Sequence, residues 1–318
     1  MNVPLEKAIL LAGPTAVGKS AVAWNLAQHL DAEILGVDSM QVYRGMDLGT
    51  AKPSSMERAT VPHHMIDVAD VAESFHVAAW TQCAREILGS IYRRGRIAIL
   101  CGGTGLYFKA LIEGLGDSPA SDPGLRAVLE RTAQSDLLAE LQEKDPLLFD
   151  RIDRRNPRRV VRAVEVIRLT GRAYSEQQSP WRKKDGSTPG CTDTPQARMV
   201  FFGLDRARED LRGRVEQRVD AMFANGLVAE TERLMQRGLG KNRTASQALG
   251  YRQVIAFLRG ECSLDETIAL VKQRTWQFAR RQMTWFRNQT NLNWIKVGAG
   301  ESSKTVAARI EREWLQQR

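Results

Sequence analysis

The stretch AILLAGPTAVGKSAVAWNLAQHL, residues 8–30, decides how the fold begins. Its centre, GPTAVGKS, fits the phosphate-loop pattern G-x-x-x-x-G-K-[ST], between a short apolar run and a helical pattern. Gly13 and Gly18 let backbone N–H groups turn inward around a phosphate, and the helix adds the positive end of its dipole. Lys19 adds a full charge, and the Ser20 hydroxyl is placed to ligate Mg²⁺. The loop therefore predicts a bound diphosphate or triphosphate with Mg²⁺, and ATP and a prenyl diphosphate present the same oxygens.

Further along the chain, apolar runs rich in Ile, Leu and Val recur, each bounded by Gly or Asp. Together with the apolar run that precedes the phosphate loop, they predict five short buried strands, at 8–13, 32–38, 97–103, 198–205 and 293–298. Helical patterns separate the first three. This alternation predicts an α/β fold, in which a parallel sheet is flanked by helices on both faces.

The middle of the chain breaks this alternation. Residues 117–155 carry three short helical patterns and no strand signal, so we expect a small all-helical insert in a core made of 1–116 and 156–318. A longer helix is predicted over 156–171, with an Asn-Pro start and a Gly end. Residues 172–197 are rich in turn formers, and we expect this segment to be mobile.

Composition excludes several classes of protein. The chain is 43% hydrophobic and 26% charged, as in soluble globular proteins. No apolar run approaches the roughly 20 residues that span a bilayer, and the N-terminus reads as a buried strand rather than a signal peptide. The cysteines form no C-x-x-C pair, which favours a reducing compartment without structural zinc; they are Cys83, Cys101, Cys191 and Cys262. We therefore expect a cytoplasmic protein that makes no contact with membranes.

The net charge of +9 is unevenly distributed. Residues 1–115 hold 10 Lys/Arg and 11 Asp/Glu, whereas residues 116–318 hold 36 and 26. The basic excess thus lies outside the phosphate-loop part of the chain, which favours a polyanion such as nucleic acid as partner. The alternative is that the charge only keeps the chain soluble.

A second stretch, ILGVDSMQVYRGMDLGTAKP, follows the second predicted strand. Asp38 falls just past the strand, at the edge where open α/β sheets bind ligands. A carboxylate there can hold Mg²⁺ through water or act as a general base. The amide of Gln41 could read a base edge. The alternative is a helix cap by Asp38 or Ser39, with Gln41 in solvent.

Two further stretches have comparable alternatives. In IAILCGGTGLYFKAL, Thr104 either points its hydroxyl into the phosphate crevice or caps the next helix. In VPHHMID, adjacent histidines in a strand or loop point apart and have no cysteine nearby, so His63, His64 and Asp67 do not predict a metal site. A backbone-bonded histidine is the better interpretation.

Arginines mark three candidate RNA contacts. Arg158, Arg159 and Arg162 form a basic helix face opposite an apolar stripe, so they either bind phosphates or are simply solvated. In ALGYRQ, Tyr251 could stack on an unpaired base with Arg252 on its phosphate, or could be a packed core residue.

The third candidate lies in the long C-terminal helical pattern. Apolar side chains at 3,4,3 spacing predict a core stripe there, formed by Trp276, Ala279, Met283 and Phe286. The arginines beside it could face RNA; they are Arg274, Arg280, Arg281 and Arg287.

Taken together, the motifs resemble the tRNA dimethylallyltransferases of the IPP transferase family. GPTAVGKS, DSMQVYRGMDLGTAKP, HHMID, GGTGLYFKAL, NPRRVVRA, GYRQ and RRQMTWFR occur in the family's order and spacing, from about residue 8 to 297. The resemblance implies a nucleoside-kinase-like phosphate-loop core with a helical insert that grips the anticodon stem. It also implies transfer of a dimethylallyl group from its diphosphate to N6 of the adenosine 3′ of the anticodon, in tRNAs that read codons beginning with U.

The resemblance also assigns roles. Asp38 would accept the N6 proton, Thr104 would help bind the bridging oxygen of the leaving group, and Ser20 would ligate Mg²⁺. The diphosphate would lie on Gly13, Pro14, Thr15, Ala16, Val17, Gly18, Lys19 and Ser20. The tRNA would contact Asp38, Ser39, Met40, Gln41, Arg158, Arg159, Val160, Val161, Arg162, Gly250, Tyr251 and Arg252. A monomer is expected, wrapping one anticodon stem-loop.

This sequence departs from the family pattern in small ways, and rival functions stay open. Ser20 stands where Thr is frequent, which keeps the hydroxyl, and Arg158 replaces a commoner Gln, which favours a phosphate contact over a base contact. A nucleotide or nucleoside kinase would use the same core, with ATP in the loop and the arginines as lid residues. A non-catalytic RNA-binding protein is the third hypothesis.

Overall fold

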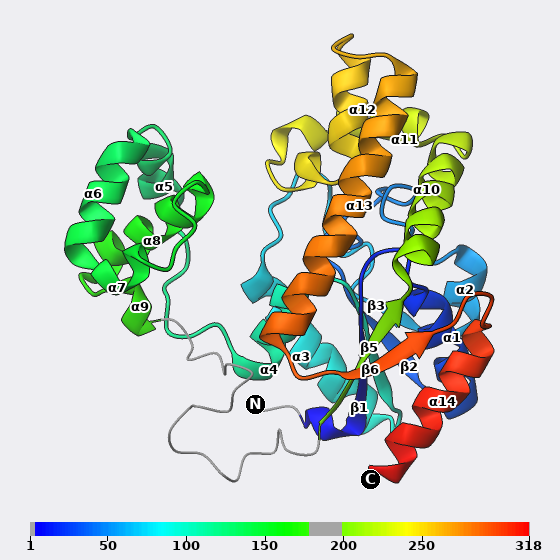
Figure 1. Ribbon diagram of the computed structural model, residues 1–318. Helices are drawn as coiled ribbons and strands as arrows, with labels where there is room; N and C mark the ends of the chain where they lie inside the picture. The colour runs from blue at the N-terminus through cyan, green and yellow to red at the C-terminus, as the bar shows by residue number, and fades with distance from the viewer. Residues whose placement is uncertain (1–3, 178–198, 318) are drawn as a thin grey trace. The chain divides into compact units, whose positions relative to one another are not determined.

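The computed structural model describes residues 4–177 and 199–317. The chain divides into two compact units, one formed by Met1–Ile112 with Arg182–Arg318 and the other by Glu113–Trp181. The first unit contains the sheet, and the second is entirely helical where it is described (Figure 1).

A parallel six-stranded sheet runs through the first unit in the order β3-β2-β4-β1-β5-β6. Its strands are β1 (Ala8–Ala12), β2 (Glu33–Val37), β3 (His63–His64), β4 (Ala98–Gly102), β5 (Val200–Arg206) and β6 (Asn293–Val297). The predicted α/β fold and its five strands are confirmed. The sixth, β3, was not predicted because two residues are too short to show a pattern.

The strand order places three chain segments at one edge of the sheet. β1 lies between β4 and β5, with Leu10 opposite Leu100 and Phe201, while β2 lies on the far side of β4. Because all strands are parallel, the segments that leave β1, β2 and β4 start from the same edge. Ligands of open α/β sheets bind at this carboxyl edge, where the strand order reverses.

Alternate residues of the buried strands pack on two helical layers. Ile9 and Leu11 share a hydrophobic cluster with α1 and α14, whereas Leu10 belongs to the cluster of α3 and α4. This period of two fits strands that are covered on both faces. The helices of these layers are α1 (Lys19–Leu30), α3 (Val77–Arg93), α4 (Gly105–Glu113) and α14 (Ser303–Gln316), with the short α2 (Ser55–Thr60) before β3.

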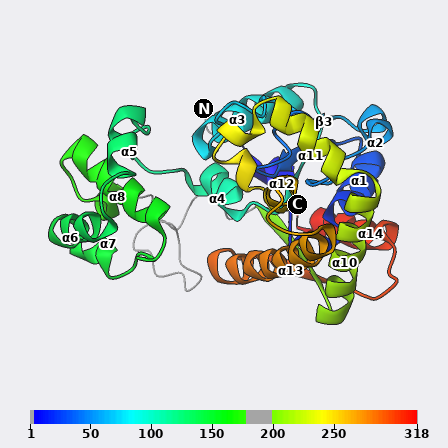
Figure 2. The same cartoon turned by 90° about the horizontal axis from the view of Figure 1, so that it is seen from above.

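Four more helices of the first unit surround the carboxyl edge of the sheet (Figures 1 and 2). They are α10 (Arg208–Ala224), α11 (Leu227–Gln236), α12 (Tyr251–Leu258) and α13 (Leu264–Gln289). The predicted core stripe of α13 is largely confirmed, because Ala279 and Phe286 are fully buried and Met283 nearly so. The opposite side of α13 stays exposed and carries arginines.

The second unit is longer than the insert expected at 117–155. Its helices are α5 (Pro123–Leu129), α6 (Gln134–Lys144), α7 (Pro146–Phe149), α8 (Pro157–Thr170) and α9 (Tyr174–Gln177). The predicted helix at 156–171 exists as α8, but its apolar stripe is part of this unit's own core. Val160 and Val164 pack there with Leu129 and Leu141. The helix therefore belongs to the insert, and the sequence-based boundary at 156 is corrected.

Three remaining predictions concern turns, thiols and membranes. Of the turn-rich segment expected at 172–197, the part from 178 onward lies outside the described residues, as does Cys191. Cys83, Cys101 and Cys262 have free thiols. Within 4–177 and 199–317, no helix combines the length and apolar character needed to cross a membrane.

Candidate active site

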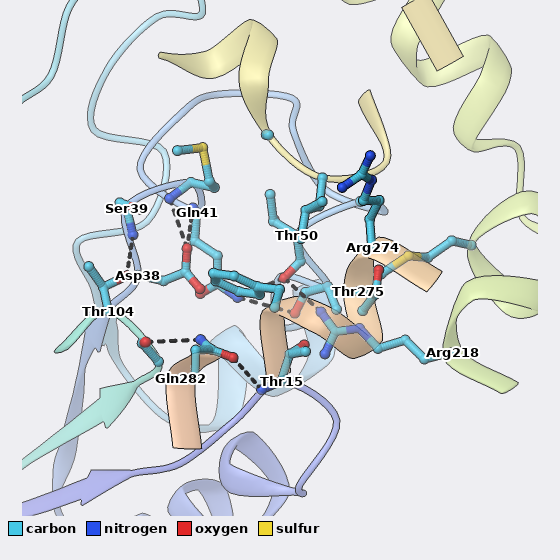
Figure 3. A pocket seen from close by; sticks show the side chains of 18 of the residues that line it. Thr15, Asp38, Ser39, Gln41, Thr50, Thr104, Arg218, Arg274, Thr275 and Gln282 are labelled. Atoms are coloured by element: carbon cyan, nitrogen blue, oxygen red, sulfur yellow. Dashed lines mark hydrogen bonds between the residues drawn. The ribbon is translucent and has the colours of Figure 1, made fainter. Parts of the chain in front are cut away.

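A cavity of about 590 Å³ lies in the first unit, at the carboxyl edge of the sheet (Figure 3). The segments that follow β1, β2 and β4 form its floor, and α10, α12 and α13 contribute its walls. Many of the predicted site residues line it together: Thr15, Lys19, Ser20, Asp38, Ser39, Met40, Gln41, Thr104 and Arg252.

The phosphate loop has the backbone that its glycines predict. Gly13 and Gly18 have φ of +151° and +104°, values that side chains with a Cβ rarely adopt. A Cβ on Gly13 would also lie only 3.0 Å from the carbonyl oxygen of Leu204. Lys19 is the first residue of α1, and its Nζ donates to the carbonyl of Pro14 at 2.6 Å. Burial lowers the pKa of Lys19 to about 8.

Two arginines hold the loop from outside the cavity. The Nε of Arg206, at the end of β5, donates to the carbonyl of Val17 at 2.8 Å. The Nε of Arg214, on α10, donates to the carbonyl of Ala16 at 2.9 Å. Ala16 itself has φ of +64°, so these bonds keep the loop in a strained conformation.

Asp38 and Thr104 are held next to one another by backbone bonds. Asp38 Oδ1 accepts the N–H groups of Met40 at 2.8 Å and Gln41 at 3.3 Å, which orients the carboxylate. Thr104 Oγ1 accepts the N–H of Ser39 at 3.1 Å. Because this hydroxyl acts as an acceptor there, its own proton can be donated into the cavity. Thr104 directly precedes α4, and its carbonyl accepts the N–H of Tyr107 at 3.0 Å. Among the described residues no bond joins its hydroxyl to the first turn of α4, so the structure gives side-chain capping no support.

Gln41 lines the cavity, but its amide is not presented as the sequence suggested. Its Nε2 donates to the carbonyls of Thr50 at 3.1 Å and Ala51 at 3.3 Å. The donor needed for side-by-side reading of a base edge is therefore engaged by the backbone. Only the acceptor Oε1 is left for a ligand.

Sequence reasoning missed Gln282, a buried residue of α13 that joins two loops of the site. Its Oε1 accepts the N–H of Thr15 at 2.8 Å, and its Nε2 donates to the carbonyl of Gly103 at 2.9 Å (Figure 3). A Cβ on Gly103 would collide with this amide. The sequence feature that could have identified Gln282 is its place as a polar residue next to Met283, on the predicted core stripe.

Arg218 of α10 was also missed. It lines the cavity, its Nη2 donates to the carbonyl of Thr50 at 3.3 Å, and its buried Nε has no hydrogen-bond partner among the described residues. Burial lowers the pKa of this guanidinium. The sequence feature that could have identified Arg218 is a charged residue between Val215 and Met222, on the apolar side of α10.

More cations stand around the mouth of the cavity, where Arg252, Arg274 and Arg281 line it with exposed side chains. Asp38 is the one carboxylate among the described residues that line the cavity. The site is therefore strongly positive, as a diphosphate and a nucleic acid both require.

Tyr251 does not face the cavity and cannot stack on a base. Its side chain is fully buried, and its hydroxyl donates to Glu230 at 2.6 Å. The packed alternative is therefore the correct one. Gly250 precedes it with φ of +88°, at the start of α12.

The remaining predicted RNA contacts lie on α8 of the second unit. Arg158 and Arg159 are exposed, whereas Val160 and Val161 are buried, so the valine side chains are not available to RNA. Arg162 pairs with Glu165 at 2.8 Å.

The two histidines bond to different protein partners. His63 Nδ1 bonds to the carbonyl of Val61 at 2.7 Å, as the backbone-bonded interpretation predicts. His64 Nε2 instead meets the carboxylate of Glu33 at 2.6 Å. In the part of the chain that the structure describes, no group of three or more His, Cys, Asp or Glu residues is arranged to hold a metal.

Comparisons with known proteins agree with these features. Residues 41–289 match the IPP transferase family model. A tRNA dimethylallyltransferase of Geobacter metallireducens is 44% identical over 292 residues, covering 91% of this chain and 92% of that protein. A tRNA dimethylallyltransferase 1 of Trichlorobacter lovleyi is 41% identical over 304 residues, covering 94% and 96%.

A solved structure is similar over the same extent. The full-length tRNA isopentenylpyrophosphate transferase from Bacillus halodurans superposes with a TM-score of 0.69 at 36% identity, covering 98% of each chain. These matches support tRNA prenylation and give the kinase alternative no support. With the resemblance of its motifs confirmed over nearly its whole length, the chain belongs to the IPP transferase family.

Proposed function

We propose that this enzyme transfers a dimethylallyl group from dimethylallyl diphosphate to N6 of the adenosine 3′ of the anticodon, in tRNAs that read codons beginning with U. Diphosphate is the second product. The observation that carries the proposal is the single positive cavity that joins a phosphate loop, Asp38 and Thr104. Relatives named tRNA dimethylallyltransferase align over more than nine-tenths of the chain, which supports the choice of substrates.

The donor would bind with its diphosphate on the phosphate loop. Loop N–H groups, Lys19 and the start of α1 offer positive charge on one side, and Arg218 offers it from α10. The unpartnered Nε of Arg218 fits an anion, because a buried donor without a partner is otherwise costly. As the bond from carbon to the bridging oxygen breaks, negative charge grows on the diphosphate, and these groups stabilise it.

Asp38 and Thr104 would act at the two reacting ends. N6 forms a bond to the allylic carbon, the carbon–oxygen bond breaks, and the proton of N6 passes to Asp38. The backbone bonds to Oδ1 leave Oδ2 for this proton. Thr104 would donate its hydroxyl proton in a hydrogen bond to the bridging oxygen of the leaving group.

The residues present fit Mg²⁺. Ser20 brings a hydroxyl into the cavity, an oxygen ligand of the kind Mg²⁺ prefers, and Asp38 stays available as the base. Mg²⁺ is commonly held by one or two protein oxygens together with substrate phosphates, so no larger ligand cluster is needed. When bound, it would neutralise part of the diphosphate charge.

The tRNA would bind to the basic parts of the chain. The target adenosine must leave its stack to reach a cavity floor, at a cost of a few kcal/mol. Arg252, Arg274 and Arg281 at the mouth can offset this cost through phosphate contacts. We also propose that the protein acts as a monomer, because one chain supplies all the groups that the reaction uses. The scattered cysteines favour the cytoplasm as its compartment.

Mass spectrometry tests the function directly. An anticodon stem-loop with adenosine after the anticodon is incubated with the enzyme, dimethylallyl diphosphate and Mg²⁺. We expect the RNA to gain one isoprenoid unit at that adenosine, with release of diphosphate. The matched control replaces that adenosine by guanosine and should gain nothing. ADP formation from ATP and a nucleoside, with an unmodified stem-loop, would contradict the proposal.

A further inference from the structure

One short segment controls two side chains of the cavity. Residues 47–51 follow the Asp38 turn, and Gly49, Thr50 and Ala51 line the cavity. The carbonyl of Thr50 accepts Gln41 Nε2 at 3.1 Å and Arg218 Nη2 at 3.3 Å. A displacement of this carbonyl would therefore move both side chains at once.

A buried pair of residues holds this segment from the side away from the cavity. Glu230 of α11 is 5% exposed and Tyr251 of α12 is fully buried. The carboxylate of Glu230 accepts the N–H of Leu48 at 3.0 Å and the hydroxyl of Tyr251 at 2.6 Å. The same hydroxyl accepts the N–H of Gly49 at 3.2 Å. Two consecutive backbone N–H groups thus donate hydrogen bonds to the buried pair of Glu230 and Tyr251.

The segment fits this pair closely. A Cβ on Gly49 would collide with the ring of Tyr251, so a glycine is required at the contact. Ala51 has φ of +48°, which an alanine adopts only when its surroundings hold it there. Neither Glu230 nor Tyr251 lines the cavity.

We propose that Glu230 and Tyr251 are positioning residues of this enzyme. They fix residues 47–51, and through the carbonyl of Thr50 they hold Gln41 and Arg218 in the orientation that substrates meet. The inference rests on the proposed function for its rate measurements only. Its binding measurement stands apart from that function.

The substitution Tyr251→Phe removes the hydroxyl and keeps the packed ring. We expect kcat/KM for the stem-loop to fall about tenfold and the Kd of inorganic diphosphate to rise several-fold, because Arg218 loses its anchor. Tyr43→Phe is the matched control, since Tyr43 is equally buried and its hydroxyl has no partner among the described residues. It should leave both quantities unchanged.

A double-mutant cycle separates positioning from general loss of stability. If Tyr251 acts on Arg218 through the carbonyl of Thr50, then Tyr251→Phe should cost much less in an Arg218→Gln background than in the wild type. A merely structural role predicts a lowered Tm, and any kinetic losses of the two single variants should then simply add in the double variant. Should Tyr251→Phe not fold, Glu230→Gln tests the same link, because the neutral amide keeps the volume but weakens both bonds.

The outcomes distinguish this inference from the proposed function. Additive effects, or a Kd for diphosphate that Tyr251→Phe leaves at the wild-type value, would overturn the positioning role. A wild-type enzyme that prenylates no RNA would overturn the function, while the diphosphate measurement would still decide the inference.

Discussion

Arg218 in the cavity differs from Arg162 and Arg168 of α8 in what it binds. Arg218 meets one backbone carbonyl and keeps a buried Nε without a partner in the described residues. On α8, Arg162 pairs with the buried carboxylate of Glu165, and Arg168 makes a two-pronged pair with Glu140 at 2.6 and 3.0 Å. An arginine whose charge is matched by a carboxylate stabilises the fold, whereas one that meets only a carbonyl keeps its charge for an anion. Sequence alone shows both as arginines on amphipathic helices.

The largest expected effect tests the acid–base half of the cavity. Asp38→Ala removes the group that we propose accepts the N6 proton, so we expect single-turnover prenylation to fall about a thousandfold. Stem-loop binding, measured by fluorescence anisotropy, should change little. Asp38→Asn is the matched control for volume, and it should be equally slow. Weakened binding with unimpaired chemistry would refute the role of base.

The next prediction separates the two kinds of arginine. Arg218→Gln should lower kcat/KM for the donor about a hundredfold, because the positive charge that stabilises the departing diphosphate is lost. Arg162→Gln should leave that constant near the wild-type value and lower the free energy of unfolding by about 2 kcal/mol, since Glu165 loses a charged partner. Steady-state kinetics with the donor measures kcat/KM, and urea unfolding measures the free energy of unfolding. Equal kinetic losses in the two variants would break the comparison.

A third prediction concerns pH. Because burial disfavours the charged form, Lys19 loses its proton near pH 8 rather than in the usual range of lysine. We expect kcat/KM for the donor to be level below pH 8 and to fall by about tenfold per unit above it, as the attraction for diphosphate disappears. In Lys19→Arg the side chain stays charged, so its profile should stay level over the same range. If kcat/KM of the Lys19→Arg variant still fell above pH 8, the titration would belong to another group.

The smallest effect is expected on the exposed side of α8. Arg159→Gln should weaken stem-loop binding a few-fold and reduce the slope of log K against log salt by about 0.9, as the loss of one phosphate contact predicts. Arg168→Gln, whose guanidinium is paired with Glu140, is the control and should leave the slope unchanged. Identical slopes in both variants would mean that Arg159 is only solvated.

Much of the fold could be predicted because its signals are local. Each of the five predicted strands is an apolar run with its own boundaries, and the phosphate loop is a contiguous pattern. The assignment of α8 failed because its apolar stripe shows that a helix packs, but not on what. Val160 and Val164 pack on helices of the insert rather than on the sheet.

The site was less predictable for the same reason. Asp38 and Thr104 follow strands, so the topology brings them together, and this could be inferred. Gln282 reaches Thr15 from 267 residues away, and no local pattern encodes that contact. Tyr251 looked available beside Arg252, yet Glu230, 21 residues earlier, takes up its hydroxyl in the interior.

The bridge made by Gln282 has a consequence for how the enzyme is synthesised. The phosphate loop leaves the ribosome early, but the side chain that fastens it to the turn after β4 is carried by α13, near the end of the chain. The whole helical insert is translated in between. A nascent chain therefore carries the phosphate-loop sequence long before it can fasten that loop, so unfinished translation products should be inert rather than partly active.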